Sequence, residues 1–202
     1  MDHMRRTSRQ EKDWPEEEAL PRGGEPSHPW KATTQVRPTL AATRILTTLS
    51  PLMRIRLVCF GKIAPKPLGP AVEEYAQRLE KLCKLEIHEI AEAQGPDALK
   101  REAELALRKL EGCSVRLALD SRGEAWTSER WGEQLEICRR ESPELGLVIG
   151  SANGLHADLL GRCRKVSLGP ITLPHSMARL VLLEQVYRAH TIVLGLPYHL
   201  GH

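Results

Sequence analysis

The chain has 202 residues, of which 41% are hydrophobic, 27% are charged and 4% are aromatic, and its net charge is +3. This length suits one domain, or one domain with an appendage. The few aromatic residues argue against an aromatic β-sandwich and against a base-stacking RNA-recognition sheet. The mild charge neither indicates nor excludes nucleic-acid binding. No apolar run approaches the roughly 18 residues of a membrane-spanning helix, so we expect a protein without membrane contact.

Residues 1–52 differ in composition from the rest. Three consecutive glutamates follow Trp14-Pro15, several prolines and glycines come next, and the stretch from residue 31 to 52 is rich in threonine and free of acids. No period of 2 or 3.6 is sustained, which predicts a disordered extension, or a loose helix around residues 41–49. Three explanations are open: a start assigned too far upstream, a targeting segment for an organelle, or a genuine tail. We favour the first, because Met53–Val58 reads as the beginning of a strand.

From Met53 onward, predicted strands alternate with predicted helices. The strands are short apolar or alternating runs at residues 55–60, 85–90, 115–119, 145–149 and 166–168. The helices have apolar residues at helical spacing or a capping residue at their start, and they cover residues 70–84, 97–112, 127–140, 156–163 and 175–191. Strands separated by helices indicate βαβ units. We therefore predict an α/β fold with a mainly parallel sheet and helices on both faces.

The cysteines indicate a reducing compartment. They are five in number, lie 24 to 30 residues apart and show no CxxC or Cys/His metal spacing. Each lies in or beside an apolar stretch, where a reduced cysteine acts as a small hydrophobic residue. We expect no disulfide framework, no metal site and, most simply, a cytoplasmic location.

Candidate binding residues lie beyond the ends of three predicted strands, where open α/β sheets bind ligands. These segments are residues 119–123, 150–154 and 168–175, and their small residues allow backbone amides to approach a ligand. No GxGxxG, GxxxxGK[ST] or GxSxG motif occurs, which argues against dehydrogenase, P-loop and hydrolase chemistry. From local sequence alone, Asp120 is a ligand, a base or a turn residue, and Gly150–Gly154 can be an ordinary turn.

A basic cluster beside the last predicted strand has two interpretations. Arg162, Arg164 and Lys165 form either a solvated face or a contact to RNA phosphates.

Six short motifs occur in order along the chain. They are Gly61-Lys62, Leu119-Asp120-x-x-Gly123, Leu147-Val148-Ile149-Gly150-x-x-x-Gly154, Leu173-Pro174-His175, Glu184-Gln185-x-Tyr187-Arg188-Ala189 and Pro197-Tyr198-His199. Together they closely resemble the ribosomal RNA large subunit methyltransferase H family, the pseudouridine-N3 methyltransferases of the SPOUT superfamily. The resemblance runs from Met53 to the C-terminus and leaves residues 1–52 uncovered.

The resemblance implies an α/β knot over residues 53–202, a homodimer, and S-adenosylmethionine as cofactor. It implies that the substrate is a pseudouridine in a hairpin loop of large-subunit ribosomal RNA, methylated at N3 on the assembled ribosome. By position, the cofactor would be held by Leu119, Gly150, Leu168, Gly169, Pro170, Ile171, Thr172 and Leu173. The candidates for shaping the transfer are Tyr198, His199, His175 and Arg179.

Two departures from the family pattern leave other functions open. Ser151 stands where the family usually has a second glycine, and Leu200 stands where it has a basic residue. They motivate a non-catalytic knotted protein that binds the ribosome as one alternative. A SPOUT methyltransferase acting on transfer RNA is another.

Overall fold

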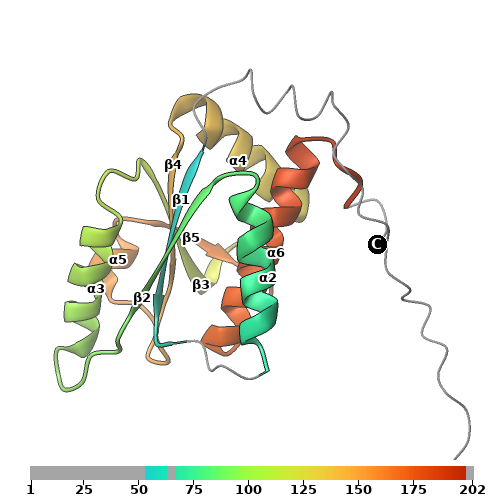
Figure 1. The fold of residues 1–202 in the computed structure, drawn as a ribbon. Helices are drawn as coiled ribbons and strands as arrows, with labels where there is room; N and C mark the ends of the chain where they lie inside the picture. Colours follow the sequence, from blue (N-terminus) through green and yellow to red (C-terminus); the bar gives the residue numbers. More distant parts are fainter. Residues whose placement is uncertain (1–52, 63–66, 199–202) are drawn as a thin grey trace, which may run out of the picture. The chain divides into compact units, whose positions relative to one another are not determined.

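The computed structural model describes residues 53–62 and 67–198 (Figure 1). The strands are β1 Arg54–Phe60, β2 Lys84–Ile90, β3 Val115–Ala125, β4 Glu144–Ile149 and β5 Arg164–Ser167. The helices are α2 Gly69–Glu80, α3 Ala98–Lys109, α4 Ser128–Glu141, α5 Ala157–Leu160 and α6 His175–Val193. The predictions about residues 1–52, His199 and Leu200 lie outside the described residues.

The strands form one sheet in the order β2-β1-β4-β3-β5, and every neighbouring pair is parallel. This confirms the predicted α/β fold. Because all these strands run the same way, their carboxyl ends meet at one edge of the sheet. Residues that follow different strands, and lie far apart in the sequence, are therefore brought together at that edge.

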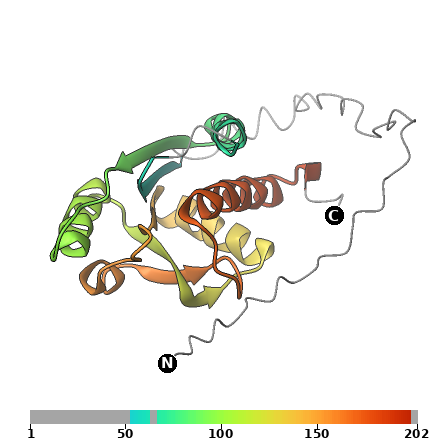
Figure 2. The same ribbon diagram turned by 90° about the horizontal axis from the view of Figure 1, so that it is seen from below.

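Helices cover both faces of the sheet, as predicted. Helices α3 and α5 lie on one face, and α2, α4 and α6 lie on the other (Figures 1 and 2). Side chains that alternate along a strand supply two separate cores. In β1, for example, Leu57 packs in the core under α2, α4 and α6, whereas Val58 packs in the core under α3 and α5.

The predicted end of the third strand was wrong. Strand β3 continues to Ala125, and both Leu119 and Glu124 pair with Val166 of β5, so that the residues between them form a bulge. Gly123 makes this bulge possible, because a Cβ there would lie 2.6 Å from the backbone nitrogen of Val166. Asp120 lies within the bulge, where its carboxylate accepts the backbone N–H of Arg122 at 2.8 Å.

All five cysteines are free, as expected, and four of them are buried. Burial raises the pKa of the Cys59 and Cys83 thiols to about 12, so both are protonated at neutral pH.

Within the described ranges, no helix is both long and apolar enough to cross a membrane. The same residues contain no group of three or more His, Cys, Asp or Glu side chains placed to hold a metal ion.

Candidate functional site

The register of the sheet brings three of the predicted cofactor segments to one place. Leu119 of β3 lies opposite Ile149 of β4 and Val166 of β5. Gly150 is therefore one residue beyond this row, and Leu168 is two residues beyond it. The three segments converge at the carboxyl edge of neighbouring strands, which is where α/β sheets bind ligands.

The turn after β4 is built on glycine. A Cβ at Gly150 would lie 2.7 Å from the carbonyl oxygen of Gly154, so the backbone of the turn folds directly onto Gly150. The N–H of Gly154 donates to the carbonyl of Ser151 at 2.9 Å, and Gly154 has a φ of +84°, which favours glycine. The close fold of this turn therefore depends on glycine at both positions.

The loop from residue 168 to 173 carries one strongly exposed apolar side chain. Ser167 Oγ donates to the carbonyl of Gly169 at 2.9 Å, which shapes the beginning of the loop. Ile171 is 62% exposed, an unusual state for a large apolar side chain, whereas Leu168 and Leu173 pack against the core. An exposed isoleucine suits a ligand with an apolar face, such as a nucleobase.

Arg179 is buried, and its guanidinium is bound by other residues of the chain. Its side chain is 2% exposed, pairs with Glu89 and donates to the carbonyl oxygen of Gly61 at 3.0 Å. It therefore links α6 to the ends of β1 and β2, and its guanidinium is closed to solvent. His175, one helical turn earlier, is partly exposed, and its Nε2 would lie 3.6 Å from a Cβ at Gly61.

Tyr198 lies in a cluster of aromatic and charged side chains. Its hydroxyl donates to Glu184 at 3.2 Å and lies 3.0 Å from the hydroxyl of Tyr75. Its ring packs edge-on against Tyr187 with the centroids 4.9 Å apart, and the Arg188 guanidinium lies over it at 5.0 Å. Burial and these neighbours raise the pKa of Tyr198 above its ordinary value.

The structure separates the candidate catalytic residues within one chain. Glu184, which Tyr198 contacts, is nine residues from His175 along α6, or roughly 14 Å at 1.5 Å per residue. Tyr198 therefore lies away from the end of α6 that holds His175 and Arg179. In the described part of the chain, these three side chains do not come together.

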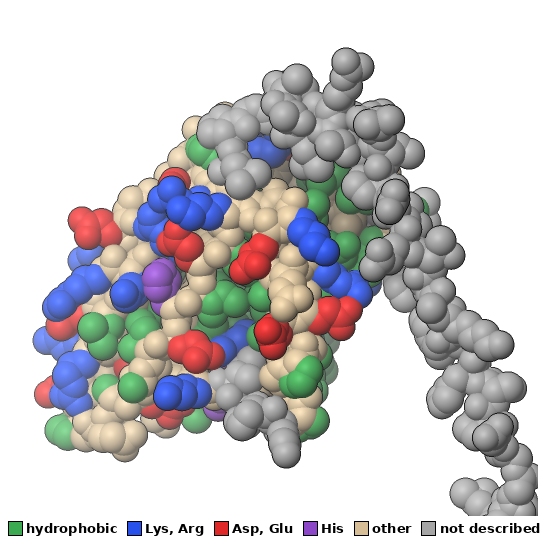
Figure 3. Space-filling model, in the orientation of Figure 1, with side chains coloured by type: hydrophobic (Ala, Val, Ile, Leu, Met, Phe, Trp, Pro, Cys, Tyr) green, Lys and Arg blue, Asp and Glu red, His purple; other side chains and the backbone are tan. Residues whose placement is uncertain are grey.

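Arg164 and Lys165 do not form one patch. Arg164 donates to Glu124 at 2.6 Å and to Gln134 at 3.1 Å, and its guanidinium lies 4.9 Å from the Trp126 ring centroid. Lys165 is the next residue of β5, so its side chain points to the other side of the sheet. On the face seen in Figure 3, Lys and Arg side chains are likewise interspersed with Asp and Glu.

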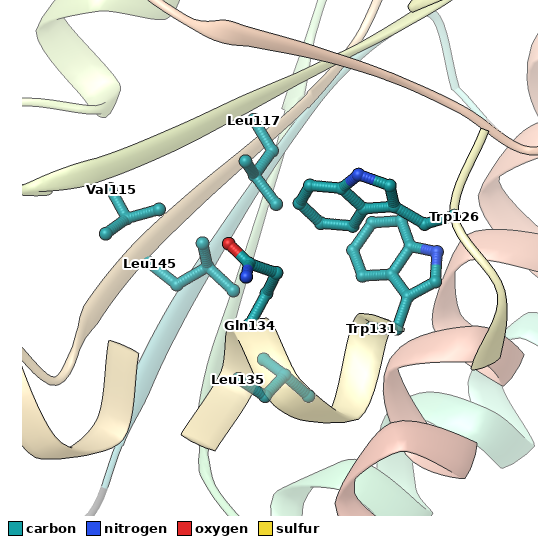
Figure 4. A pocket seen from close by; sticks show the side chains of 7 residues that line it. All are labelled: Val115, Leu117, Trp126, Trp131, Gln134, Leu135 and Leu145. Carbon is teal, nitrogen blue, oxygen red and sulfur yellow. The ribbon is translucent and has the colours of Figure 1, made fainter. Parts of the chain in front are cut away.

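A small apolar cavity lies beneath Trp126. It encloses about 10 Å³, which is room for one water molecule at most. In Figure 4, the Trp126 and Trp131 rings close one side of it, and the pair packs edge-on with the centroids 4.9 Å apart. The cavity is a packing defect of the core and is too small for a nucleotide-sized ligand.

Sequence reasoning missed the carboxylates of the site. Glu89 pairs with Arg179, Glu92 lies beside Gly61, and Glu102 accepts a hydrogen bond from Ser151. Only Glu102 gave a usable signal, because it falls three residues after Leu99 on the apolar stripe of α3. A charged residue at a core position of an amphipathic helix requires hydrogen-bonding partners.

Comparison with known proteins assigns the class. A family model described as "Predicted SPOUT methyltransferase" matches residues 53–199. The chain is 40% identical over 158 residues to ribosomal RNA large subunit methyltransferase H of Clostridium botulinum (strain Kyoto / Type A2), covering 73% of this chain and 99% of that protein. The enzyme of the same name from Anaeromyxobacter sp. (strain Fw109-5) is 41% identical over 152 residues, with the same coverage. The chain therefore belongs to the SPOUT methyltransferases and, within them, to the family of ribosomal RNA large subunit methyltransferase H.

Two solved structures resemble the fold at low sequence identity. TrmJ from Z. mobilis ZM4 is 13% identical with a TM-score of 0.43, covering 70% of this chain and 71% of that one. A probable methyltransferase from Bordetella pertussis Tohama I is 16% identical with a TM-score of 0.44, covering 74% and 98%.

Proposed function

We propose that this protein uses S-adenosylmethionine to methylate N3 of a pseudouridine in a hairpin loop of large-subunit ribosomal RNA. It acts on assembled ribosomes, as a cytoplasmic homodimer with a knotted C-terminal region. The observation that carries the proposal is the convergence of Leu119, Gly150 and the 168–173 loop at one edge of the sheet. We infer the ribosomal RNA substrate from the name of the relatives. We infer the pseudouridine and its N3 position from the resemblance of the six motifs.

The residues at this edge fit the cofactor. A Cβ at Gly154 or Gly169 would meet no atom within 4 Å, so there is open space beside both residues. Exposed Ile171 can cover one face of an adenine, and the neighbouring backbone groups can bond its edge and the methionine portion. When bound, S-adenosylmethionine supplies an electrophilic methyl group on its sulfonium sulfur.

The chain's own residues must handle a proton. N3 of a neutral pseudouridine carries a hydrogen and is a poor nucleophile, and methylation replaces that hydrogen. The protein must hold the base in line with the methyl group and accept the proton that leaves. We assign this to His175 and His199, because a neutral imidazole has a ring nitrogen that can accept a proton.

Arg179 and Tyr198 serve as positioning residues in this proposal. Arg179 is occupied by Glu89 and Gly61, and it fixes the helix that carries His175. The Tyr198 hydroxyl is occupied as a donor to Glu184, and its raised pKa makes it a weak acid. Tyr198 thereby fastens the segment that leads to His199.

RNA contact depends on local charge rather than on overall charge. From Met53 onward, the chain has 21 Lys and Arg against 19 Asp and Glu. We assign phosphate contacts to Arg162 and Lys165, which are exposed, and a supporting role to Arg164, which is paired with Glu124. Charge reversal at Arg162 and Lys165 should weaken ribosome binding and reduce its salt dependence, whereas unchanged affinity would remove both residues from the interface.

The test uses labelled S-adenosylmethionine with three substrates: ribosomes that lack the modification, free large-subunit ribosomal RNA, and bulk transfer RNA. We expect transfer to ribosomes alone, and 3-methylpseudouridine on nucleoside analysis. Methylation of transfer RNA alone would show that the substrate is transfer RNA and not the ribosome. Cofactor binding without transfer to any of the three would indicate a non-catalytic ribosome-binding protein.

A further inference from the structure

A buried hydrogen bond joins the turn after β4 to helix α3. Ser151 Oγ donates to Glu102 Oε2 at 3.0 Å, and both residues are buried. The other carboxylate oxygen of Glu102 accepts the backbone N–H of Ala93 at 2.9 Å. One carboxylate therefore connects α3 to two separate segments, which follow β4 and β2.

This carboxylate is a costly element of the core. Glu102 lies beside Ala103 and Ala106, which are buried against the sheet. An apolar side chain would fill this position without a desolvation cost, whereas a buried carboxylate requires donors. Among the described residues, the donors to Glu102 are neutral ones, a hydroxyl and a backbone amide. Its presence therefore suggests a role that packing alone does not explain.

Ser151 is the buried base of the turn that contains Gly150. The turn closes through the hydrogen bond from Gly154 to Ser151, and the two residues form an antiparallel bridge. Ala152, Asn153 and Gly154 are exposed. The Ser151 hydroxyl thus holds the base of the turn through its hydrogen bond to Glu102, whereas the tip of the turn is exposed to solvent.

The Ser151 hydroxyl is turned toward α3 by its hydrogen bond to Glu102. Glu102 belongs to α3, whose side chains pack in one core, whereas Leu168 and Leu173 pack against the other core. Ser151 therefore does not crowd the edge where we place the cofactor. The departure from a second glycine replaces a flexible residue with an anchored one.

We propose that Glu102 and Ser151 are positioning residues that hold the Gly150–Gly154 turn in the conformation that receives S-adenosylmethionine. The identity of the ligand in this inference rests on the proposed function. Neither residue touches the reacting atoms, and both act through the backbone of the turn. Their effect is expected in cofactor affinity, and in the apparent KM for the cofactor more than in kcat at saturation.

The experiment compares wild type with Glu102→Ala, Glu102→Gln, Ser151→Ala and the double variant Glu102→Ala/Ser151→Ala. Glu104→Ala is the matched control, because Glu104 lies on the same helix and is exposed. S-adenosylmethionine affinity is measured by calorimetry, and protection of the 150–155 amides is measured by hydrogen exchange without ligand. Thermal unfolding verifies that each variant is folded.

We expect Glu102→Ala and Ser151→Ala each to weaken cofactor binding about tenfold, as for loss of one buried hydrogen bond. The double variant should be no weaker than Glu102→Ala, because both changes remove the same contact. Glu102→Gln should remain within about threefold of wild type, since its amide can accept from Ala93 and donate to Ser151. The amides of the turn should exchange faster in Glu102→Ala and in Ser151→Ala than in wild type. Their exchange rate should be unchanged in Glu104→Ala.

Wild-type affinity in folded Ser151→Ala and Glu102→Ala, or additive losses in the double variant, would overturn the inference. If Glu102→Ala does not fold, the cofactor affinities of Ser151→Ala and Glu102→Gln decide the inference. It then requires the expected loss in Ser151→Ala and near wild-type affinity in Glu102→Gln. If wild type binds no S-adenosylmethionine, the proposed function fails and hydrogen exchange decides the positioning role. Faster exchange of the turn in Ser151→Ala would then support that role, and equal exchange would reject it.

Discussion

The Arg179 guanidinium donates to the carbonyl oxygen of Gly61 at 3.0 Å, across 118 residues of chain. The same guanidinium pairs with Glu89 of β2. Because Arg179 lies in α6 and Gly61 directly follows β1, these contacts fix the beginning of α6 over the carboxyl ends of two strands. His175 lies one turn before Arg179, so the contact also determines where His175 stands.

Replacing Arg179 by methionine should lower the free energy of unfolding by about 1–3 kcal/mol, since the Gly61 carbonyl loses a charged donor. The loss is smaller than for a fully buried ion pair, because Glu89 is 41% exposed and can regain water. Urea denaturation measures it. Arg140→Met is the control, since Arg140 is 72% exposed and its pair with Glu136 should contribute below about 0.5 kcal/mol. Equal losses in the two variants would contradict a specific role for Arg179.

Replacing Gly150 by alanine should weaken S-adenosylmethionine binding at least about tenfold, because the turn must move to make room for the alanine side chain. The added Cβ would lie 2.7 Å from a backbone oxygen of Gly154. Gly161→Ala is a matched control, since its Cβ would lie 3.4 Å from the nearest atom, the Ala157 carbonyl oxygen. Calorimetric titration of both variants gives the comparison. Full affinity in Gly150→Ala would exclude this turn from the cofactor site.

Replacing Tyr198 by phenylalanine should reduce stability by about 0.5–1.5 kcal/mol, because the ring contact with Tyr187 remains and the hydroxyl contacts with Glu184 and Tyr75 are lost. Since the pKa of Tyr198 is raised, its hydroxyl does not titrate near neutrality. The pH profile of methyl transfer should therefore keep its shape in Tyr198→Phe, with a lower rate. A profile that loses one of its limbs would instead make Tyr198 a proton-transfer group.

His190 should make stability depend on pH. Burial lowers its pKa below the ordinary value, and in the described part of the chain its Nε2 has no hydrogen-bond partner. As the pH falls below about 6.5, the unfolded chain takes up a proton that the folded chain resists, so stability falls. Between pH 7.5 and 5.5, wild type should lose about 1 kcal/mol more than His190→Gln in urea denaturation. Equal losses in the two proteins would show that the buried ring does not titrate differently on folding.

Local patterns in the sequence were enough to predict most of the secondary structure and the fold class. Strands β1, β2 and β4 and helices α4 and α6 were predicted to within a few residues, because hydrophobic periodicity and capping residues act over a few positions. The order of elements was enough to predict a parallel sheet. The cofactor segments came from a resemblance of motifs, and their meeting at one edge follows from the parallel strands.

The contacts of individual side chains depend on the tertiary structure. It extended β3 through a bulge against β5, buried Arg179 against Gly61 and Glu89, and gave Ser151 a partner 49 residues earlier in Glu102. It also set Tyr198 against Tyr75, 123 residues earlier in the chain, far from His175. These contacts join residues that no local pattern relates, and whether a charged or hydroxyl group is catalytic or structural depends on its burial and partners. The sheet therefore follows from short-range periodicity, whereas the chemistry of its edge follows from which distant residues the fold places in contact.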